Sequence, residues 1–293
     1  MRLLLAYQPP YDWPAMLGFL SARAVVGMEA IVDGVYSRSI GLNGVHGTFS
    51  IKPVAGDALQ VTLDFPDAAA VPEIVARLRR MFDLDADLPT IHRPLKTDPL
   101  MARLIAERPG LRVPGAWDGL ELAIRAVLGQ QITVSAAIRL AGKLVAQYGQ
   151  PLASVLPGIT SVFPEAAVLA VADLATLGMP KTRGRTLSGV AQALLDDPLL
   201  FEPGREGGVA RLLALNGIGD WTAQYIALRQ LRQLRQLREM DAFPSGDVGL
   251  IKALVALEGE RVTARELSAR AQDWRPFRGY AAQLLWTSLS RMD

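Results

Sequence analysis

The chain has 293 residues, 50% of them hydrophobic and 20% charged, and a formal net charge of +2 at pH 7. It contains no cysteine, which excludes disulfides, thiol catalysis, iron–sulfur clusters and cysteine-based zinc sites. No segment is apolar for the length of a membrane span, and the apolar run at 3–7 is too short for a signal-peptide core, so we expect about two or three domains in the cytoplasm.

Residues 1–88 are predicted to form a small α/β unit. Short β-like runs are separated by turn residues at Asn43-Gly44 and Gly56-Asp57. The predicted strands are 34–42, 44–54 and 58–65, and helical spacing is found at 16–25 and 71–82. This pattern favours an antiparallel sheet with helices packed on one face.

From residue 89 onward the chain is predicted to be helical throughout. Asp98 and Pro99 have the form of a helix N-cap followed by a proline in the first turn, and that helix is expected to end at 108–110. Further helix starts are expected at Asp118, at Thr133 or Ser135, and at Pro164. The predicted fold class is therefore α+β.

A tight glycine-rich hairpin joins two predicted helices within residues 211–226. Gly217 and Gly219 bracket Ile218, and glycine supplies the positive φ and the close backbone approach that a side chain would block. The second helix begins at Asp220, so its free N–H groups are expected to point outward, where they can bind a phosphate.

One acid, Asp247, follows the hairpin in the segment FPSGDVGL, at the start of another predicted helix. An aspartate before a helical run is an ordinary N-cap, and capping would also orient its carboxylate. Asp241 is another acid close to Asp247 in the sequence, and it lacks the same sequence context.

These segments resemble the helix-hairpin-helix/Gly-Pro-Asp superfamily of base-excision DNA glycosylases, and among them the AlkA-type 3-methyladenine DNA glycosylase II. Four blocks carry the resemblance in the same order and at similar spacing: YQPPYDWPAMLGFLSARA (7–24), LRVPGAWDGLELAIRAVLGQQITVSAA (111–137), the hairpin segment (211–250) and WRPFRGYAAQLLW (274–286). The resemblance implies that 1–88 folds like half of a TATA-binding protein. It implies two all-α domains, one of 116–230 ending in the hairpin and one joining 89–115 to 231–293, with the active site between them.

The resemblance also implies that Asp247 is catalytic. Breaking the bond between a base and deoxyribose develops positive charge on the sugar, which a nearby carboxylate stabilises. Superfamily members that also nick DNA carry a lysine two residues after the second hairpin glycine, where this chain has Trp221. We therefore expect a monofunctional glycosylase in which Asp247 orients or deprotonates a water nucleophile.

The expected substrates are alkylated purines of the 3-methyladenine and 7-methylguanine type, removed in base excision repair. Such bases are cationic and leave without protonation, and His46 and His92 lie outside the matched catalytic blocks. Two alternatives stay open: a glycosylase for deaminated or oxidised bases, and a protein that flips damaged bases without cutting. The expected partner is double-stranded DNA containing damaged bases, bound by a monomer with no required cofactor.

By the same resemblance the flipped base would lie among Trp221, Tyr225 and Phe277, with Phe19 at the pocket edge. Electron-rich rings attract a cationic heterocycle, although each ring could instead pack in a helix core. Phe277 stands where the family usually has tryptophan. The other C-terminal aromatics recur at helical spacing and are expected in the core: Trp274, Tyr280 and Trp286.

DNA contacts are expected at the hairpin, through Gly217, Ile218, Gly219 and Thr222. Another is expected at Gln131, where a relative inserts a leucine into the gap left by the flipped base, although Gln131 could instead only cap its turn. The main-chain carbonyls of three hairpin residues would hold a monovalent cation, Na or K: Leu213, Leu215 and Ile218.

Basic residues favour the C-terminal part of the chain. Residues 101–293 hold 22 basic against 18 acidic residues, whereas residues 1–100 hold 9 against 11. A group of cations at 181–185 and the repeat LRQLRQLRQLRE (228–239) could add phosphate contacts. The alternatives are a solvated helix start and a tandem expansion without function. The cations in question are Lys181, Arg183 and Arg185, and Arg229, Arg232, Arg235 and Arg238.

Overall fold

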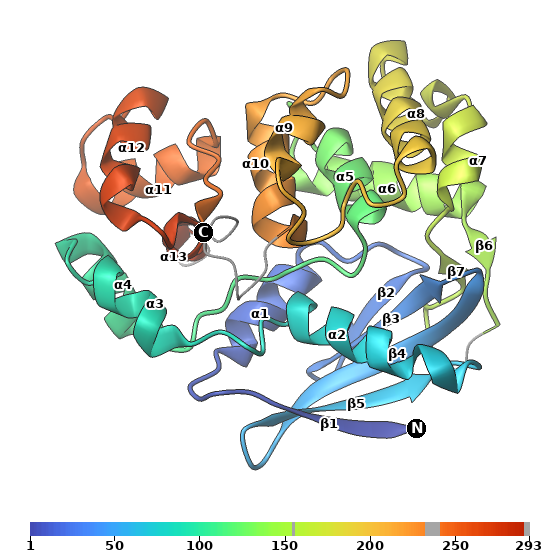
Figure 1. The fold of residues 1–293 in the computed structure, drawn as a ribbon, viewed down its shortest axis with the longest axis horizontal. Helices are drawn as coiled ribbons and strands as arrows, with labels where there is room; N and C mark the ends of the chain where they lie inside the picture. The colour runs from blue at the N-terminus through green and yellow to red at the C-terminus, as the bar shows by residue number, and fades with distance from the viewer. Residues whose placement is uncertain (154–155, 232–240, 290–293) are drawn as a thin grey trace.

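The computed structural model describes residues 1–153, 156–231 and 241–289 (Figure 1). Five antiparallel strands form an N-terminal sheet in the order β1-β5-β4-β3-β2. The strands are β1 (Arg2–Ala6), β2 (Glu29–Val32), β3 (Val35–Leu42), β4 (Val45–Val54) and β5 (Ala58–Asp64). A second, two-stranded sheet pairs β6 (Gln150–Pro151) with β7 (Ser161–Val162).

The turn predicted between β3 and β4 is confirmed. Leu42 pairs with Val45, so Asn43 and Gly44 form a two-residue hairpin loop. Their φ angles of 52° and 74° match the turn type that asparagine followed by glycine favours. Strands β1 and β2, which were not predicted from the sequence, are short strands at the two edges of the sheet.

Two helices pack on one face of this sheet, as predicted. They are α1 (Trp13–Ser21) and α2 (Val71–Met81), and α2 follows a short 3-10 turn, η1 (Ala68–Ala70). Asp12 caps α1 by accepting the N–H of Ala15, so the helix begins before the predicted position and ends at Ser21 rather than at residue 25. Alternate strand residues such as Tyr36 and Phe49 form a common core with α1 and α2.

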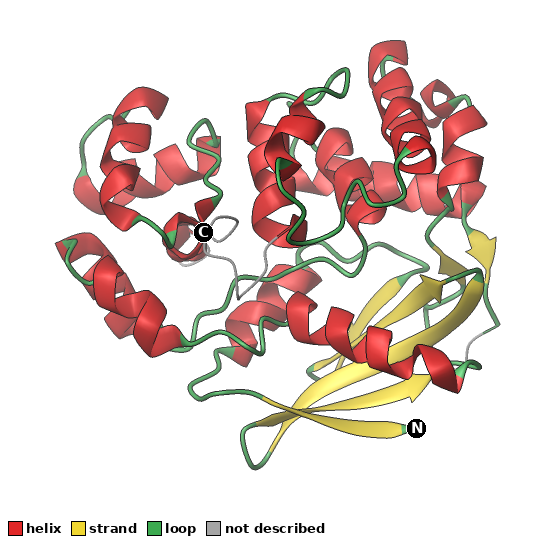
Figure 2. Cartoon of the chain, in the orientation of Figure 1, coloured by secondary structure: helices red, strands yellow, loops and turns green. Residues whose placement is uncertain are grey.

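The rest of the described chain is mostly helical, so the predicted α+β class is confirmed (Figure 2). The longer helices are α3 (Leu88–Leu95), α4 (Pro99–Glu107), α5 (Gly119–Leu128), α6 (Val134–Tyr148), α7 (Ala166–Val171), α8 (Lys181–Asp196), α9 (Gly208–Leu213), α10 (Asp220–Ile226), α11 (Val248–Glu258), α12 (Ala264–Arg270) and α13 (Arg278–Leu289). Short helical turns are η2 (Leu174–Leu177), η3 (Ala227–Leu231), which is a π-helical turn, and η5 (Ala271–Trp274).

The expected helix caps are present. Asp98 caps α4, Asp118 caps α5 and Thr133 caps α6, each through a side-chain oxygen that accepts a backbone N–H of the first turn. Near Pro164 the helix begins slightly later than expected, with Glu165 in the N-cap position. Within the described ranges, no helix has both the length and the apolar character needed to cross a bilayer.

The helices form two groups that share one continuous hydrophobic core. One group packs α4 and α11 against α13, and the other packs α7 and α5 against α8, with α10 against α5 (Figure 1). This grouping agrees with the expected association of 89–115 with the C-terminal segment. The exact domain boundaries stay a prediction.

A buried ion network ties α5 to the N-terminal sheet. Arg38 of β3 donates to Glu121 of α5 at 2.5 Å. Arg125, one turn further along α5, pairs with Glu121 at 2.9 Å and with Glu29 of β2 at 3.0 Å. Burial alone would raise the pKa of Glu29, but the charges of Arg125 and Arg38 outweigh it and lower that pKa. The network therefore fixes the helix that leads into Gln130 and Gln131.

Candidate active site and nucleic-acid interface

Asp247 is held by three N–H donors at the start of α11. Its side chain caps the helix by accepting the Leu250 N–H at 3.0 Å. The indole N–H of Trp221 donates to Oδ2 at 2.7 Å, and the indole N–H of Trp286 donates to Oδ1 at 2.8 Å. The half-buried carboxylate is thus fixed by α10, α11 and α13 together, and these helices come from both helical groups. The predicted dual role of Asp247, as cap and oriented carboxylate, fits this geometry.

Trp286 packs against the helical core, as expected, and its indole also lies beside Asp247. Besides its bond to Asp247, its ring meets the Tyr225 ring edge-on, with centroids 6.3 Å apart. Trp274 and Tyr280 are buried in the core, as expected.

The other aromatic residues divide between the surroundings of Asp247 and the helical core. Trp221 and Tyr225, one turn apart on α10, stack with centroids 5.4 Å apart and an interplanar angle of 14°. The guanidinium of Arg229 lies over the rings of Phe19 and Tyr225, which places Phe19 of α1 close to Tyr225. Phe277 is only 5% exposed and packs in the helical core, where it offers little ring face to a base.

Asp241, the other candidate for the catalytic carboxylate, is part of a structural ion cluster. Its carboxylate is buried and accepts from Arg278 Nε at 2.8 Å, and it also pairs with Arg275. Both partners flank Phe277 just before and at the start of α13. These contacts anchor the segment before α11 and leave Asp247 as the candidate for chemistry.

The hairpin between α9 and α10 shows different roles for its two glycines. Gly217 has a φ of +83°, and a Cβ there would meet Thr186 Oγ1 of α8 at 2.1 Å. Gly219 has a φ of −90°, so the expectation of positive φ is wrong at that position. A Cβ on Gly219 would meet nothing within 4 Å, so the space above it is open.

The start of α10 is free to bind an anion, but not through Thr222. The helix has no side-chain N-cap bond, and Gly217, Gly219 and Asp220 are exposed while Ile218 is buried. Thr222 is only 2% exposed, and its hydroxyl accepts from Gln130 at 3.0 Å, so its side chain faces the protein. Backbone N–H groups, and not this hydroxyl, are therefore the available phosphate donors.

Gln130, which was not predicted from the sequence, links the hairpin to the loop that carries Gln131. Its side-chain amide donates to the Gly217 carbonyl and to Thr222, each at 3.0 Å. Its own carbonyl accepts from Arg183 of α8 at 2.6 Å, so this arginine already has a protein partner. Gln131 follows with a φ of +58° and an exposed side chain, beside the exposed Ile132.

Arg229 does not fit the hypothesis that the LRQ repeat adds phosphate contacts. It is 3% exposed, and its Nη1 donates to the Pro114 carbonyl at 2.7 Å, so it cannot be a surface phosphate contact. Arg232, Arg235 and Arg238 lie outside the described residues.

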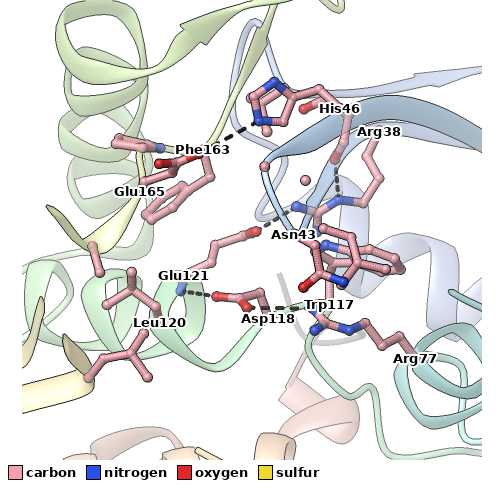
Figure 3. A pocket seen from close by; sticks show the side chains of 18 residues that line it. Arg38, Asn43, His46, Arg77, Trp117, Asp118, Leu120, Glu121, Phe163 and Glu165 are labelled. Carbon is pink, nitrogen blue, oxygen red and sulfur yellow. Dashed lines mark hydrogen bonds and ion pairs between the residues drawn. The ribbon is translucent and has the colours of Figure 1, made fainter. Parts of the chain in front are cut away.

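The two histidines, and the cavity that His46 lines, lie apart from the hairpin and from α11. Burial, together with the charges of Lys96 and Arg112, lowers the pKa of His92 on α3 to about 4. His46 lines a cavity of about 260 Å³ between the sheet and α5, shown in Figure 3 with Arg38, Trp117 and Glu121. This cavity has no lining residue from the hairpin or from α11. Among the described residues, no cluster of three or more His, Asp or Glu side chains could hold a metal ion.

A hairpin with uncapped N–H groups beside an aspartate held by two indoles is the arrangement expected of a helix-hairpin-helix DNA-repair protein. Residues 2–118 match the model of the AlkA N-terminal domain, and residues 124–276 match that of the HhH-GPD superfamily base excision DNA repair protein. The chain belongs to this HhH-GPD superfamily.

Relatives cover the whole chain. It is 39% identical, over 99% of its length, to the probable bifunctional transcriptional activator/DNA repair enzyme AlkA of Mycobacterium tuberculosis, and it spans 57% of that protein. It is 34% identical, over 96% of its length, to DNA-3-methyladenine glycosylase 2 of Escherichia coli, of which it covers 95%. The solved 3-methyladenine DNA-glycosylase of Archaeoglobus fulgidus has the same fold, with a TM-score of 0.82 at 21% identity over 98% of this chain and 97% of that one.

Proposed function

We propose that this chain is a DNA glycosylase that flips out and hydrolytically excises alkylated purines of the 3-methyladenine and 7-methylguanine type in base excision repair. The observation that carries the proposal is the carboxylate of Asp247, fixed by Trp221 and Trp286 beside the stacked ring of Tyr225. The names of the Escherichia coli and Mycobacterium tuberculosis relatives support it. We propose that it acts as a monomer on double-stranded DNA without a required cofactor.

Asp247 would act on the sugar and on water. As the bond from C1′ to the base nitrogen breaks, its electron pair goes to the base and positive charge develops on the sugar, where the carboxylate stabilises it. A water molecule then adds to C1′, and Asp247 takes or directs its proton. A protein that only bound lesions would have no use for a carboxylate oriented in this way.

The proposed enzyme leaves the DNA strand intact. Position 221, where a Schiff-base lysine would stand, holds a tryptophan whose N–H is bonded to Asp247. The product should be an abasic site in an unbroken strand, as resolved on a denaturing gel after incubation with a lesion-containing duplex. A protein–DNA adduct trapped by borohydride would contradict this mechanism.

The substrate class is tested with duplexes that each carry one 7-methylguanine, hypoxanthine or 8-oxoguanine. Release of the methylated base at the highest rate supports the proposal. Exclusive release of hypoxanthine or of 8-oxoguanine would favour the alternative of a glycosylase for deaminated or oxidised bases. Tight binding of all three duplexes without release would favour a lesion-binding protein.

The hairpin glycines allow phosphate contact to be separated from folding. Gly219→Ala fits within the protein, so we expect normal stability but about 10-fold weaker binding to damaged and undamaged DNA alike, because the methyl group keeps a phosphate from the backbone N–H groups. Gly217→Ala should weaken binding and also lower the melting temperature, because it forces alanine into a positive φ against Thr186. Fluorescence anisotropy and thermal melts measure the two effects. Selective loss of lesion preference in Gly219→Ala would contradict the assignment.

A monovalent cation could strengthen this anchor. Main-chain carbonyls suit Na or K, and we propose those of Leu213, Leu215 and Ile218 as the ligands. The Leu215 carbonyl accepts the Ile218 N–H at 3.1 Å, which holds the loop in a tight turn. Replacing Na and K in the buffer with choline at equal ionic strength should weaken DNA binding; unchanged affinity would dismiss the site.

Gln131 is the proposed wedge. Its exposed side chain, in a left-handed backbone conformation, stands on a loop that Gln130 ties to the hairpin, so phosphate binding and insertion would be coupled. Gln131→Ala should lower affinity for an abasic-site analogue and slow base release from duplex more than from single-stranded DNA. Equal loss on both substrates, or none on either, would leave Gln131 as only a turn residue.

A further inference from the structure

A buried guanidinium lies against the aromatic rings close to Asp247. Arg229, on the π-helical turn η3 after α10, lies with its Cζ atom 4.4 Å from the ring centroid of Phe19, 4.8 Å from that of Tyr225 and 5.4 Å from that of Trp286. These distances are within the range of cation–π attraction. The ring faces that could attract a cationic base are therefore already partly used by a cation of the protein itself.

This cation is fixed in place. Its Nη1 donates to the Pro114 carbonyl at 2.7 Å, and its Nη2 donates to the Gln283 side-chain oxygen of α13 at 3.4 Å. An arginine stays charged even when it is buried. Burial alone would raise the pKa of the Tyr225 hydroxyl, but the charges of Arg229, Arg23 and Arg125 outweigh it and lower that pKa. The surroundings of Tyr225 are thus electropositive.

Asp247 and Arg229 contact the same aromatic residue in two different ways. The Trp286 indole donates its N–H to Asp247 and presents its ring to Arg229. Trp221, the other indole on Asp247, stacks on Tyr225, whose ring also lies under Arg229. The site therefore has a negative charge where the sugar becomes positive and a positive charge where the rings would hold the base.

We propose that Arg229 determines specificity by favouring bases that are neutral before cleavage over bases that are cationic; this inference rests on the proposed glycosylase function. When the bond between C1′ and the base nitrogen breaks, the electron pair goes to the base and the sugar becomes an oxocarbenium ion. A neutral base thus gains negative charge and afterwards takes a proton from water, whereas a cationic base leaves as a neutral molecule. In the transition state Arg229 attracts the initially neutral base, which is becoming negative, and still repels the cationic base.

The effect of Arg229 should be seen in kcat/KM, which reports the free energy of the transition state relative to the free enzyme and substrate. Cationic alkylated purines leave readily by their own chemistry, and Arg229 reduces their advantage. Neutral modified purines such as hypoxanthine leave less readily, and Arg229 assists them. A fixed cation in the pocket would thereby broaden the substrate range.

The test compares wild type, Arg229→Met and Arg229→Lys on two duplexes, one with hypoxanthine and one with 7-methylguanine. In Arg229→Met the ratio of kcat/KM for hypoxanthine to that for 7-methylguanine should fall by about 10-fold or more, because hypoxanthine loses an attraction and 7-methylguanine loses a repulsion. Arg229→Lys keeps the charge and should keep the ratio within a few-fold. An equal fall on both substrates, or an unchanged ratio, overturns the inference. Release of neither base by the wild type would instead refute the proposed function.

A measurement on the wild-type protein avoids any folding defect of the variants. Quinoline and N-methylquinolinium have nearly the same shape, and they differ in charge at pH 7. With 7-methylguanine release as the readout, neutral quinoline should inhibit at about 10-fold lower concentration than the cation. Stronger inhibition by N-methylquinolinium would overturn the inference.

Discussion

Asp247→Asn should reduce base release by about 10²-fold or more, because it removes the main electrostatic stabiliser of the sugar cation. The structure adds a second reason. Asp247 accepts indole N–H groups on both carboxylate oxygens, whereas asparagine has one oxygen and would turn an NH₂ group toward one of the indoles. DNA affinity should stay within a few-fold of wild type, because the hairpin is unchanged.

The matched control for this variant is Asp87→Asn. Asp87 also caps a helix, α3, by accepting the Thr90 N–H, but it is exposed. Asparagine is as good a cap as aspartate, so this control should keep both activity and stability. Single-turnover release of 7-methylguanine measures both variants. Near-normal turnover by Asp247→Asn would move catalysis to another residue.

Glu121→Gln should lower the free energy of unfolding by about 3–5 kcal/mol, because it leaves buried arginines without their carboxylate partner. Glu121 is buried between Arg38 at 2.5 Å and Arg125 at 2.9 Å, and Glu29 alone would have to balance both charges. The loss should be visible as a shift of the urea midpoint.

Glu73→Gln is the matched control for this prediction. Glu73 pairs with Arg77 at 2.7 Å, one turn along α2, but its side chain is half exposed. Surface ion pairs of this kind contribute about 1 kcal/mol or less, so the control should unfold almost as the wild type does. If Glu121→Gln and Glu73→Gln had equal, small effects, the buried network would not be what holds α5 on the sheet.

The features predicted correctly from the sequence are those set by local rules. The caps at Asp98, Asp118 and Asp247 depend on backbone groups two or three residues away, and the turn at Asn43-Gly44 on two φ angles. Gly217 was predicted only in part: its positive φ is a local property, whereas the closeness of Thr186 of α8, which leaves no room for a Cβ, is not.

The features that were missed depend on contacts between distant segments. Trp286 lies 39 residues from Asp247, and its helical spacing alone is that of a core residue. Gln130 reaches the hairpin across 87 and 92 residues, and Arg229 reaches Pro114 across 115. Periodicity within one helix cannot show which distant segment each of its faces meets, so these three positions required the structure.

Chromatography of the bases that the protein releases from DNA methylated by dimethyl sulfate tests directly whether it excises alkylated purines. Free 3-methyladenine and 7-methylguanine should appear in the soluble fraction, with the DNA left abasic and unbroken, and unmethylated DNA should release neither. Absence of both methylated bases, with the protein folded and bound to the DNA, would contradict the proposed function.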